Sequence, residues 1–283
     1  MCKGDLKFHP PRSFKCEQNH AVDLAKDNFL YLAKRNKKKG ENAAADVAIR
    51  ARREFFDAGG FHKPYDDIAK EIVMAIRGCP NFDLDFSGAH VLNAGCGEGR
   101  TLRSLRSALL KEPGGAHVTF WGTDPSKLSI KLAARRQLDA HFAVSSTSSL
   151  PFADGSMDVV ACAFAPSPWE EICRVLRPGG AVVVARPGPE HLIELKGESS
   201  RREPKQFAAG LGERYERYLE VETYSSADAR KLIEMSQLQS NLSSTVLAGL
   251  ASGLLNVTVD VLTTTHRVWL GTGGYREKPG ILY

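Results

Sequence analysis

A glycine-rich pentapeptide carries the strongest chemical signal in this sequence. Gly95-Cys96-Gly97-Glu98-Gly99 follows the short apolar run His90–Asn93 and precedes a helical segment. Glycines at such a turn let the backbone approach a ligand without a clash from Cβ atoms. A dinucleotide fingerprint needs Gly or Ala at its sixth position, which Arg100 occupies here, and Glu98 would face the pyrophosphate with a carboxylate. The loop therefore favours a ligand that has no phosphate and has a cationic end, such as S-adenosylmethionine.

Polar residues follow the next two predicted strands. Asp124 comes after the strand expected over 118–122, and Ser145 and Ser146 follow the strand expected over His141–Val144. The carboxyl ends of parallel strands meet at one edge of a sheet, and ligands bind there at the topological switch point. A carboxylate at this edge can accept hydrogen bonds from both hydroxyls of a ribose, and the serines would face an adenine.

A third candidate segment, Phe164-Ala165-Pro166, follows the apolar strand expected over Met157–Ala163. A sulfonium methyl group is already electrophilic, so the protein mainly has to align a nucleophile and exclude water. The backbone carbonyls of this segment could orient a nitrogen nucleophile, which makes it the predicted substrate-positioning loop; a hydrophobic turn is the alternative interpretation. Trp169 is equally suited to stacking on a flat substrate and to covering the following helix. No catalytic base is identified.

The alternation of apolar strands and helices from residue 89 onward predicts the fold class. Strands are expected over 90–93, 118–122, 141–144, 157–163 and 181–185, with helices over 100–111, 126–137 and 170–176. Such alternation is typical of an α/β fold with a doubly wound, Rossmann-like parallel sheet. Helical periods at 43–58 and 64–77 precede this region, and a strand near 218–224, helices near 227–235 and 242–254 and a β-rich segment over 257–270 follow it.

Composition narrows the class of protein. The 283 residues are 42% apolar and 25% charged, which excludes collagen-like, disordered and disulfide-scaffold proteins. Six cysteines over this length suit a reducing compartment, and the start of the chain does not resemble a signal peptide. The most apolar stretch, Thr245–Leu262, is interrupted by polar residues, so no membrane span is expected. These features predict a cytoplasmic globular protein without a membrane partner.

Positive charge is concentrated in the N-terminal part of the chain. Residues 1–63 carry 14 Lys and Arg against 8 Asp and Glu, and the densest run lies at 34–39. Clustered cations attract phosphates and release counterions, so one interpretation is a module that faces nucleic acid. The alternative is a solvated linker that ends at Gly40.

Several longer motifs give the sequence a family resemblance. It resembles the RlmA-type ribosomal RNA methyltransferases, which methylate guanine at ring nitrogen 1 in 23S rRNA and include members that confer macrolide resistance. The resemblance covers roughly residues 14–200 and rests on FKCEQNHAVDLAKDNFLYL, RARREFFDAGGF, NAGCGEGRTL, GTDPSKLSIKLAARR, SSLPFADGSMD, FAPSPWEEICRVLRPGG and RPGPEHLIELKG. It implies a class I methyltransferase fold that uses S-adenosylmethionine, a small N-terminal zinc-ribbon-like lobe and a homodimer.

The resemblance also implies individual cofactor contacts. They fall on Phe61 (usually Tyr in the family), Gly97, Glu98 and His191. The fold argument adds four further predicted cofactor residues, namely Asn93, Gly95, Asp124 and Ser146. The alternatives are a core aromatic at a helix end for Phe61, and a satisfied polar side chain beside 187–189 for His191.

The N-terminal lobe departs from the family pattern. Family members carry Cys-x2-Cys followed by Cys-x3-His; Cys16 and His20 keep the second pair, and only Cys2 can represent the first. These three residues are the predicted metal ligands, completed by His9 or water, although structural zinc sites have four protein ligands. Retained zinc and a degenerate, metal-free lobe both stay open. The predicted domains are the lobe over 1–40, a helical linker over 41–85 and the methyltransferase domain over 86–283.

The residues near the cofactor and the target base depart further from the family pattern. Asn93 stands where the family has Asp, and 235–239 reads Met-Ser-Gln-Leu-Gln where the family has a loop with Met, Pro and Trp near the target base. Three functions therefore stay open. The first is an N-methyltransferase for ribosomal RNA, and the second is an N-methyltransferase for a small heterocyclic or amine substrate of specialised metabolism. The third is a non-enzymatic RNA-binding protein with a vestigial pocket.

Overall fold

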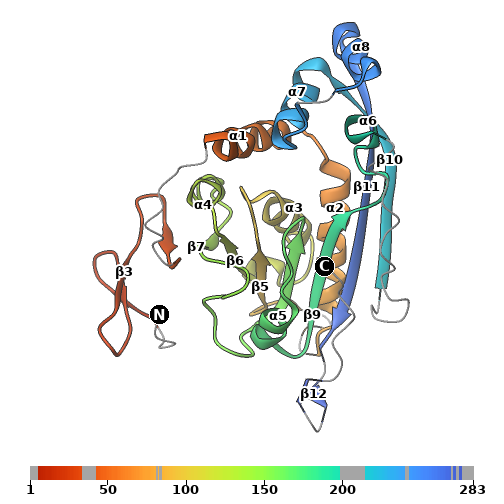
Figure 1. Cartoon of the computed structure of the whole chain (residues 1–283). Coiled ribbons are helices and arrows are strands. Elements are labelled where there is room, and N and C mark those ends of the chain that lie inside the picture. Colours follow the sequence, from red (N-terminus) through yellow and green to blue (C-terminus); the bar gives the residue numbers. More distant parts are fainter. Residues whose placement is uncertain are drawn as a thin grey trace.

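An eight-stranded sheet forms the centre of the molecule (Figure 1). The computed structural model describes residues 6–33, 43–80, 82, 85–197, 214–239, 242–268, 270–271 and 274–275. The strands are β4 (Phe29–Tyr31), β5 (His90–Ala94), β6 (Thr119–Asp124), β7 (Ala140–Val144), β8 (Met157–Ala163), β9 (Leu176–Pro187), β10 (Arg214–Ser225) and β11 (Leu254–Arg267). They lie in the order β10-β11-β9-β8-β5-β6-β7-β4. The predicted α/β fold is confirmed.

The six strands from β4 to β9 run parallel, whereas β11 pairs antiparallel with β9 and β10 antiparallel with β11. From β5 the chain moves outward to β6 and β7, then returns to the other side of β5 to form β8 and β9. The strand order therefore reverses at β5, where the glycine-rich loop follows. In doubly wound sheets this is the position at which ligands bind.

Helices cover both faces of the sheet. The helices are α1 (Ala43–Asp57), α2 (His62–Arg77), α3 (Arg100–Leu109), α4 (Lys127–Ala134), α5 (Trp169–Val175), α6 (Ile193–Lys196), α7 (Ser226–Met235) and α8 (Ser244–Ser252), with a short 3-10 turn η1 (Gly115–His117). Helices α1 to α4, α7 and α8 contribute to the larger apolar core, and α5 covers the smaller core on the other face. In the described part of the chain, no helix is long and apolar enough to span a membrane.

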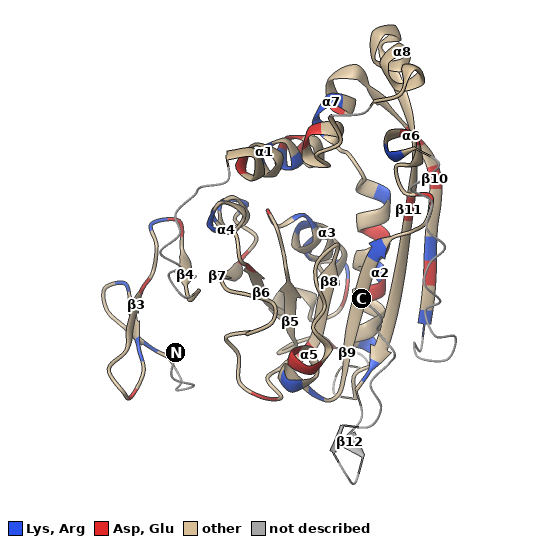
Figure 2. Cartoon of the chain, in the orientation of Figure 1, with Lys and Arg blue, Asp and Glu red and all other residues tan. Residues whose placement is uncertain are grey.

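The segment predicted as a helical linker is part of this packing. Ile68, Ile72 and Ile76 of α2 are fully buried in the larger core, and α1 packs against α7. Figure 2 shows charges of both signs along α1, α7 and β10, which form the outer surface here.

The N-terminal region divides into two parts. Strands β1 (Lys7–His9), β2 (Ser13–Lys15) and β3 (Ala21–Asp23) form a small antiparallel sheet of their own. Strand β4 instead pairs in parallel with β7 and closes one edge of the main sheet. We propose a single boundary near residue 24, in place of the predicted divisions at 40 and 85. A last hairpin joins β12 (Leu270–Gly271) to β13 (Gly274–Tyr275).

Candidate active site

A cavity of about 680 Å³ opens at the carboxyl ends of the parallel strands. Its size falls in the range of small-molecule and cofactor sites. Segments that follow β5, β6, β7, β8 and β9 all contribute to its lining. Ten of the residues predicted from the sequence line it, namely Phe61, Gly95, Gly97, Glu98, Asp124, Ser146, Phe164, Ala165, Pro166 and His191.

The glycine loop adopts a backbone that other residues disfavour. Gly95 and Gly97 have positive φ angles of 71° and 55°. A Cβ atom on Gly95 would clash with that of Ala165, whereas the space beside Gly97 is open within 4 Å. Gly97 therefore presents bare backbone to the cavity, as close approach of a ligand requires.

Asp124 fastens the loop to the end of β6. Its Oδ2 accepts a hydrogen bond from the backbone N–H of Gly97 at 3.0 Å, and its Oδ1 accepts one from Ser126 at 2.8 Å. Burial raises the pKa of Asp124, and these two N–H donors oppose that rise. Each carboxylate oxygen keeps lone pairs for hydroxyl donors of a ligand.

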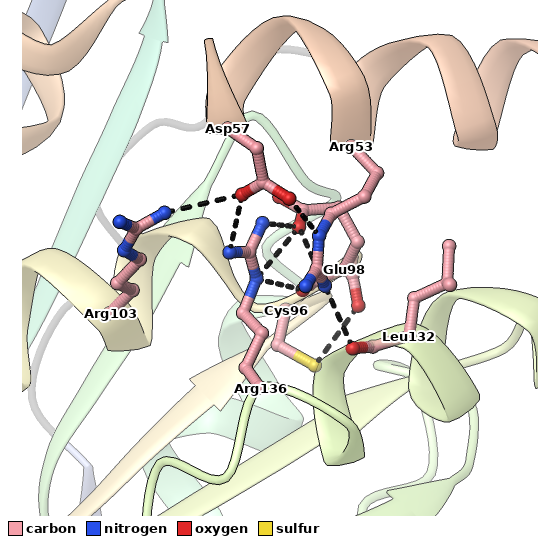
Figure 3. Close-up of polar contacts among 8 residues, drawn as sticks. Arg53, Asp57, Cys96, Glu98, Arg103, Leu132 and Arg136 are labelled. Carbon is pink, nitrogen blue, oxygen red and sulfur yellow. Dashed lines mark hydrogen bonds and ion pairs between the residues drawn. The ribbon is translucent and has the colours of Figure 1, made fainter. Parts of the chain in front are cut away.

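Glu98 is the centre of an ion-pair network beneath α1 (Figure 3). Its side chain is 1% exposed and pairs through Oε2 with Arg136, which is 4% exposed, and with Arg53 at 3.8 Å. Asp57 bridges the same arginines, accepting from Arg136 at 2.9 Å and from Arg53 at 2.5 Å. The other oxygen of Glu98, Oε1, is buried and has no hydrogen-bond partner among the described residues. The network thus ties α1 and the end of α4 to the glycine loop.

Asn93 lies beneath the loop instead of in the cavity. Its side chain is 1% exposed and donates from Nδ2 to the carbonyl of Ala161 in β8 at 3.1 Å. It is absent from the described lining of the cavity, unlike the other predicted cofactor residues. Its position favours a role in holding β5 against β8.

Ser145 and Ser146, the serines predicted to face an adenine, differ in position. Ser146 is exposed at the rim of the cavity, where its hydroxyl contacts that of Ser148 at 2.8 Å. Ser145 is buried and donates to the carbonyl of Ser149 at 3.0 Å. Ser145 therefore shapes the turn, and Ser146 is the serine that a ligand can reach.

Aromatic rings also line the cavity. Phe164 lies 5.8 Å from Tyr65 and 6.1 Å from His191 between ring centroids, and Phe61 lies 5.7 Å from His191. The backbones of Phe61, Phe164 and Leu192 are left-handed, with φ angles of 51°, 54° and 58°. Such conformations cost free energy in residues other than glycine and concentrate at functional sites. The rings suit a flat group whose faces are apolar.

His191 is a neutral imidazole in this setting. It is 7% exposed, and burial lowers its pKa to about 4. The backbone N–H of Asp260 donates to its Nδ1 at 3.3 Å, so the ring proton resides on Nε2. His191 therefore offers the cavity an N–H donor without a positive charge.

Comparison with known proteins agrees with this geometry. Residues 91–180, which contain the glycine loop, Asp124 and the segment after β8, match the family described as Methyltransferase domain. Residues 91–180 are a methyltransferase domain.

Relatives of the methyltransferase domain extend the similarity beyond those residues. A protein of Streptomyces fradiae, the 23S rRNA (guanine(748)-N(1))-methyltransferase, is 31% identical over 186 residues, which are 65% of this chain and 61% of that protein. A Micromonospora griseorubida protein, provisionally named a 23S rRNA (guanine-N(1)-)-methyltransferase, is 34% identical over 193 residues, which are 66% of this chain and 62% of that protein. The chain thus matches about three fifths of the length of these relatives, and its predicted resemblance to this group is confirmed.

Sequence reasoning missed several residues that line the cavity. Tyr65 and Phe56 belong to helical apolar faces, Arg100 begins α3, and Met235 and Ser236 come from the end of α7. In a sequence, an aromatic on a helix face that borders a ligand looks the same as one in the core. Two of these residues carried a signal. The departure from the family pattern begins at Met235, and Arg100 departs from the dinucleotide fingerprint.

Two other candidate residues, Trp169 and Cys96, have structural roles. Trp169 packs edge-on against His266 at 5.8 Å and is not part of the described cavity lining, so it covers α5. Cys96 is buried within the glycine loop, and burial raises the pKa of its thiol well above the usual value. A protonated, buried thiol is no nucleophile.

Two of the three predicted metal ligands lie in the described residues. Cys16 and His20 lie together, with 3.4 Å between Sγ and Nδ1, whereas Nδ1 of His9 faces the carbonyl of Pro10 at 3.2 Å. Cys2 lies outside the described residues, as does the basic run 34–39. Within the described ranges no group of three or more metal-binding side chains occurs.

Proposed function

We propose that this chain is an S-adenosylmethionine-dependent N-methyltransferase whose acceptor is a guanine ring nitrogen in ribosomal RNA. The observation that carries the proposal is the hydrogen bond from Gly97 to Asp124 at the rim of the cavity, at the switch point of a class I methyltransferase sheet. The relatives named above support the choice of acceptor.

The cavity fits the cofactor at both ends. Gly97 leaves open space against bare backbone, Asp124 can accept the ribose hydroxyls, and Ser146 can meet the adenine edge. The unpaired Oε1 of Glu98 is an orphaned acceptor that suits an ammonium group. When bound, the cofactor supplies an electrophilic methyl group.

We assign the positioning of the acceptor base to the aromatic rings that line the cavity. Phe164, which is 37% exposed, presents a ring on which a flat base can stack, and His191 presents an Nε2–H donor for a ring carbonyl. The backbone carbonyls of 164–166 are suited to accept the N–H of the attacking ring nitrogen. Rings on several sides also keep water away from the transferred methyl group.

Transfer of a radioactive methyl group from the cofactor tests this function. Unmodified 23S rRNA and a small-molecule extract are offered separately to the full chain, to Asp124→Ala and to Asp23→Ala, an exposed aspartate on β3 that serves as the control. We expect label in RNA with the wild type and with Asp23→Ala. With Asp124→Ala and limiting cofactor we expect roughly 10- to 100-fold less, because charge-assisted hydrogen bonds to the ribose are lost.

Two results would contradict the proposal. Label confined to small molecules would overturn the RNA acceptor and retain methyl transfer. Absence of label in both fractions, together with no binding of the cofactor, would overturn methyl transfer itself. RNA binding that weakens steeply with salt is expected for a phosphate-contacting enzyme and provides an independent measurement.

A further inference from the structure

Arg100 is a buried cation that forms no ion pair with the described residues. It is the first residue of α3 and is 8% exposed. Its guanidinium lies 6.0 Å from the ring centroid of Phe56 and 5.5 Å from that of Tyr65. Its Nε is buried and has no hydrogen-bond partner in the described part of the chain.

Such an arrangement is costly unless an anion completes it. Burying a charge is unfavourable unless the charge is paired and its hydrogen bonds are made. No ion pair joins Arg100 to a carboxylate of the described residues. Asp66 instead accepts a hydrogen bond from Ser104 at 2.9 Å. Contacts with aromatic faces offset only part of the cost of desolvation.

Arg100 borders the same cavity as the glycine loop. Glu98 and Arg100 flank Gly99 in the chain, and both line the cavity. Glu98 contributes an acceptor, Oε1, that is as unpaired as Nε of Arg100. An unpaired buried donor and an unpaired buried acceptor in the lining of one cavity match the carboxylate and ammonium of an α-amino acid.

We propose that Arg100 binds the carboxylate of the amino-acid end of S-adenosylmethionine, opposite the ammonium at Glu98. The assignment rests on the proposed function. A phosphate of the RNA is the other source of an anion. Glu98 argues against it, because its carboxylate lines the same cavity and would repel a phosphate.

Binding of two nucleosides measures this role without turnover. S-adenosylhomocysteine carries the amino-acid end and 5′-methylthioadenosine lacks it. Their affinities are determined by calorimetry for the wild type, for Arg100→Met and for Arg103→Met. Arg103 is the matched control, since it lies on the same helix, is 47% exposed and pairs with Asp57 at 3.2 Å. Methionine at 100 can keep the packing against Phe56 and Tyr65.

We expect the wild type to bind S-adenosylhomocysteine more tightly than 5′-methylthioadenosine. Arg100→Met should weaken S-adenosylhomocysteine roughly 10- to 100-fold and leave 5′-methylthioadenosine within about twofold. Arg103→Met should change neither affinity. Thermal unfolding of each variant accompanies the titrations. If Arg100→Met does not fold, Arg100→Lys replaces it, with a smaller but still selective loss expected because an ammonium cannot bind a carboxylate bidentately.

Four outcomes would contradict the inference, and each has a different meaning. Equal weakening of both nucleosides would show that Arg100 only supports the fold of the cavity. Unchanged affinity for S-adenosylhomocysteine with weaker binding of RNA would assign the anion to a phosphate. Equal wild-type affinity for both nucleosides would also overturn the inference while leaving methyl transfer intact. If the wild type binds neither, the proposed function fails as well.

Discussion

The backbone N–H of Asp260 donates a 3.3 Å hydrogen bond to Nδ1 of His191. The same aspartate accepts from the backbone N–H of Glu190 at 3.0 Å and pairs twice with Arg217 at 2.9 Å. A residue of β11 thereby holds the segment after β9 and selects the tautomer of its histidine. The antiparallel strands at this edge are part of the site, although the glycine loop lies on the parallel strands.

Stability should fall in acid because of His191. Its folded-state pKa of about 4 lies below the unfolded value of about 6.5, so the unfolded chain binds more protons in that interval and stability declines as pH falls from 6.5 to 4. The loss amounts to about 3 kcal/mol. Urea unfolding at pH 7 and pH 4.5 measures it. His191→Asn should lessen the decline, whereas the exposed His117→Asn should leave it unchanged; equal declines in all three proteins would refute the assignment.

Alanine at Gly97 should impair ligand binding more than folding. Both Gly97 and the remote Gly88 have positive φ, 55° and 82°, and open space around the missing Cβ. Each substitution by alanine should cost about 1 kcal/mol of stability through the left-handed backbone. Calorimetry should reveal weaker S-adenosylhomocysteine binding for Gly97→Ala alone. If Gly88→Ala weakens binding equally, the effect is one of stability.

Removal of the Glu98 charge should destabilise the fold. Glu98→Gln leaves the buried Arg136 without its main counter-ion, and breaking such a pair costs about 3 kcal/mol. Asp57→Asn changes a carboxylate that is 40% exposed and should cost about 1 kcal/mol or less. Equilibrium unfolding in urea gives both values. A larger loss of stability for Asp57→Asn than for Glu98→Gln would contradict this, and would mean that the exposed ion pairs of Asp57 contribute most to the attachment of α1.

Truncation should locate the N-terminal boundary. Deleting residues 1–24 removes β1 to β3 and keeps β4, whereas deleting 1–33 also removes Phe29, which is 3% exposed and lies opposite Phe142. Loss of a buried phenylalanine costs about 3 to 5 kcal/mol, and the longer deletion also bares the edge of β7. We expect a markedly lower melting temperature for the longer deletion only. Equal melting temperatures would restore the boundary at 40.

The strands and helices of the methyltransferase domain were predictable because each has a strong local pattern. Buried parallel strands are continuously apolar, as in 157–163, and glycines punctuate the helix ends. Strand β4 was not predictable, since three residues carry little periodicity and their partner β7 is distant in the chain. The same limit applies to β11 beside β9.

The candidate site was predictable where geometry follows from strand ends, as at Asp124 and Phe164. The site was not predictable where side-chain packing determines which residues can reach a ligand. Asn93 lies at a strand position typical of a ligand contact, but its side chain is buried beneath the loop and its Nδ2 donates to the carbonyl of Ala161. Arg100 appeared only as a departure from a dinucleotide motif, because an unpaired buried charge becomes visible only when its neighbours are known.

The position of β11 beside β9 has a consequence for protein synthesis. Asp260 and Thr258 hold the segment after β9 through their backbone carbonyls, which accept from Gly188 and Leu192 at 2.8 Å each. A nascent chain leaves the ribosome N-terminus first, so the parallel strands emerge while this edge is still bare. A translation product that stops before residue 254 carries the glycine loop but no finished acceptor pocket. Its open sheet edge would also mark it for aggregation or degradation.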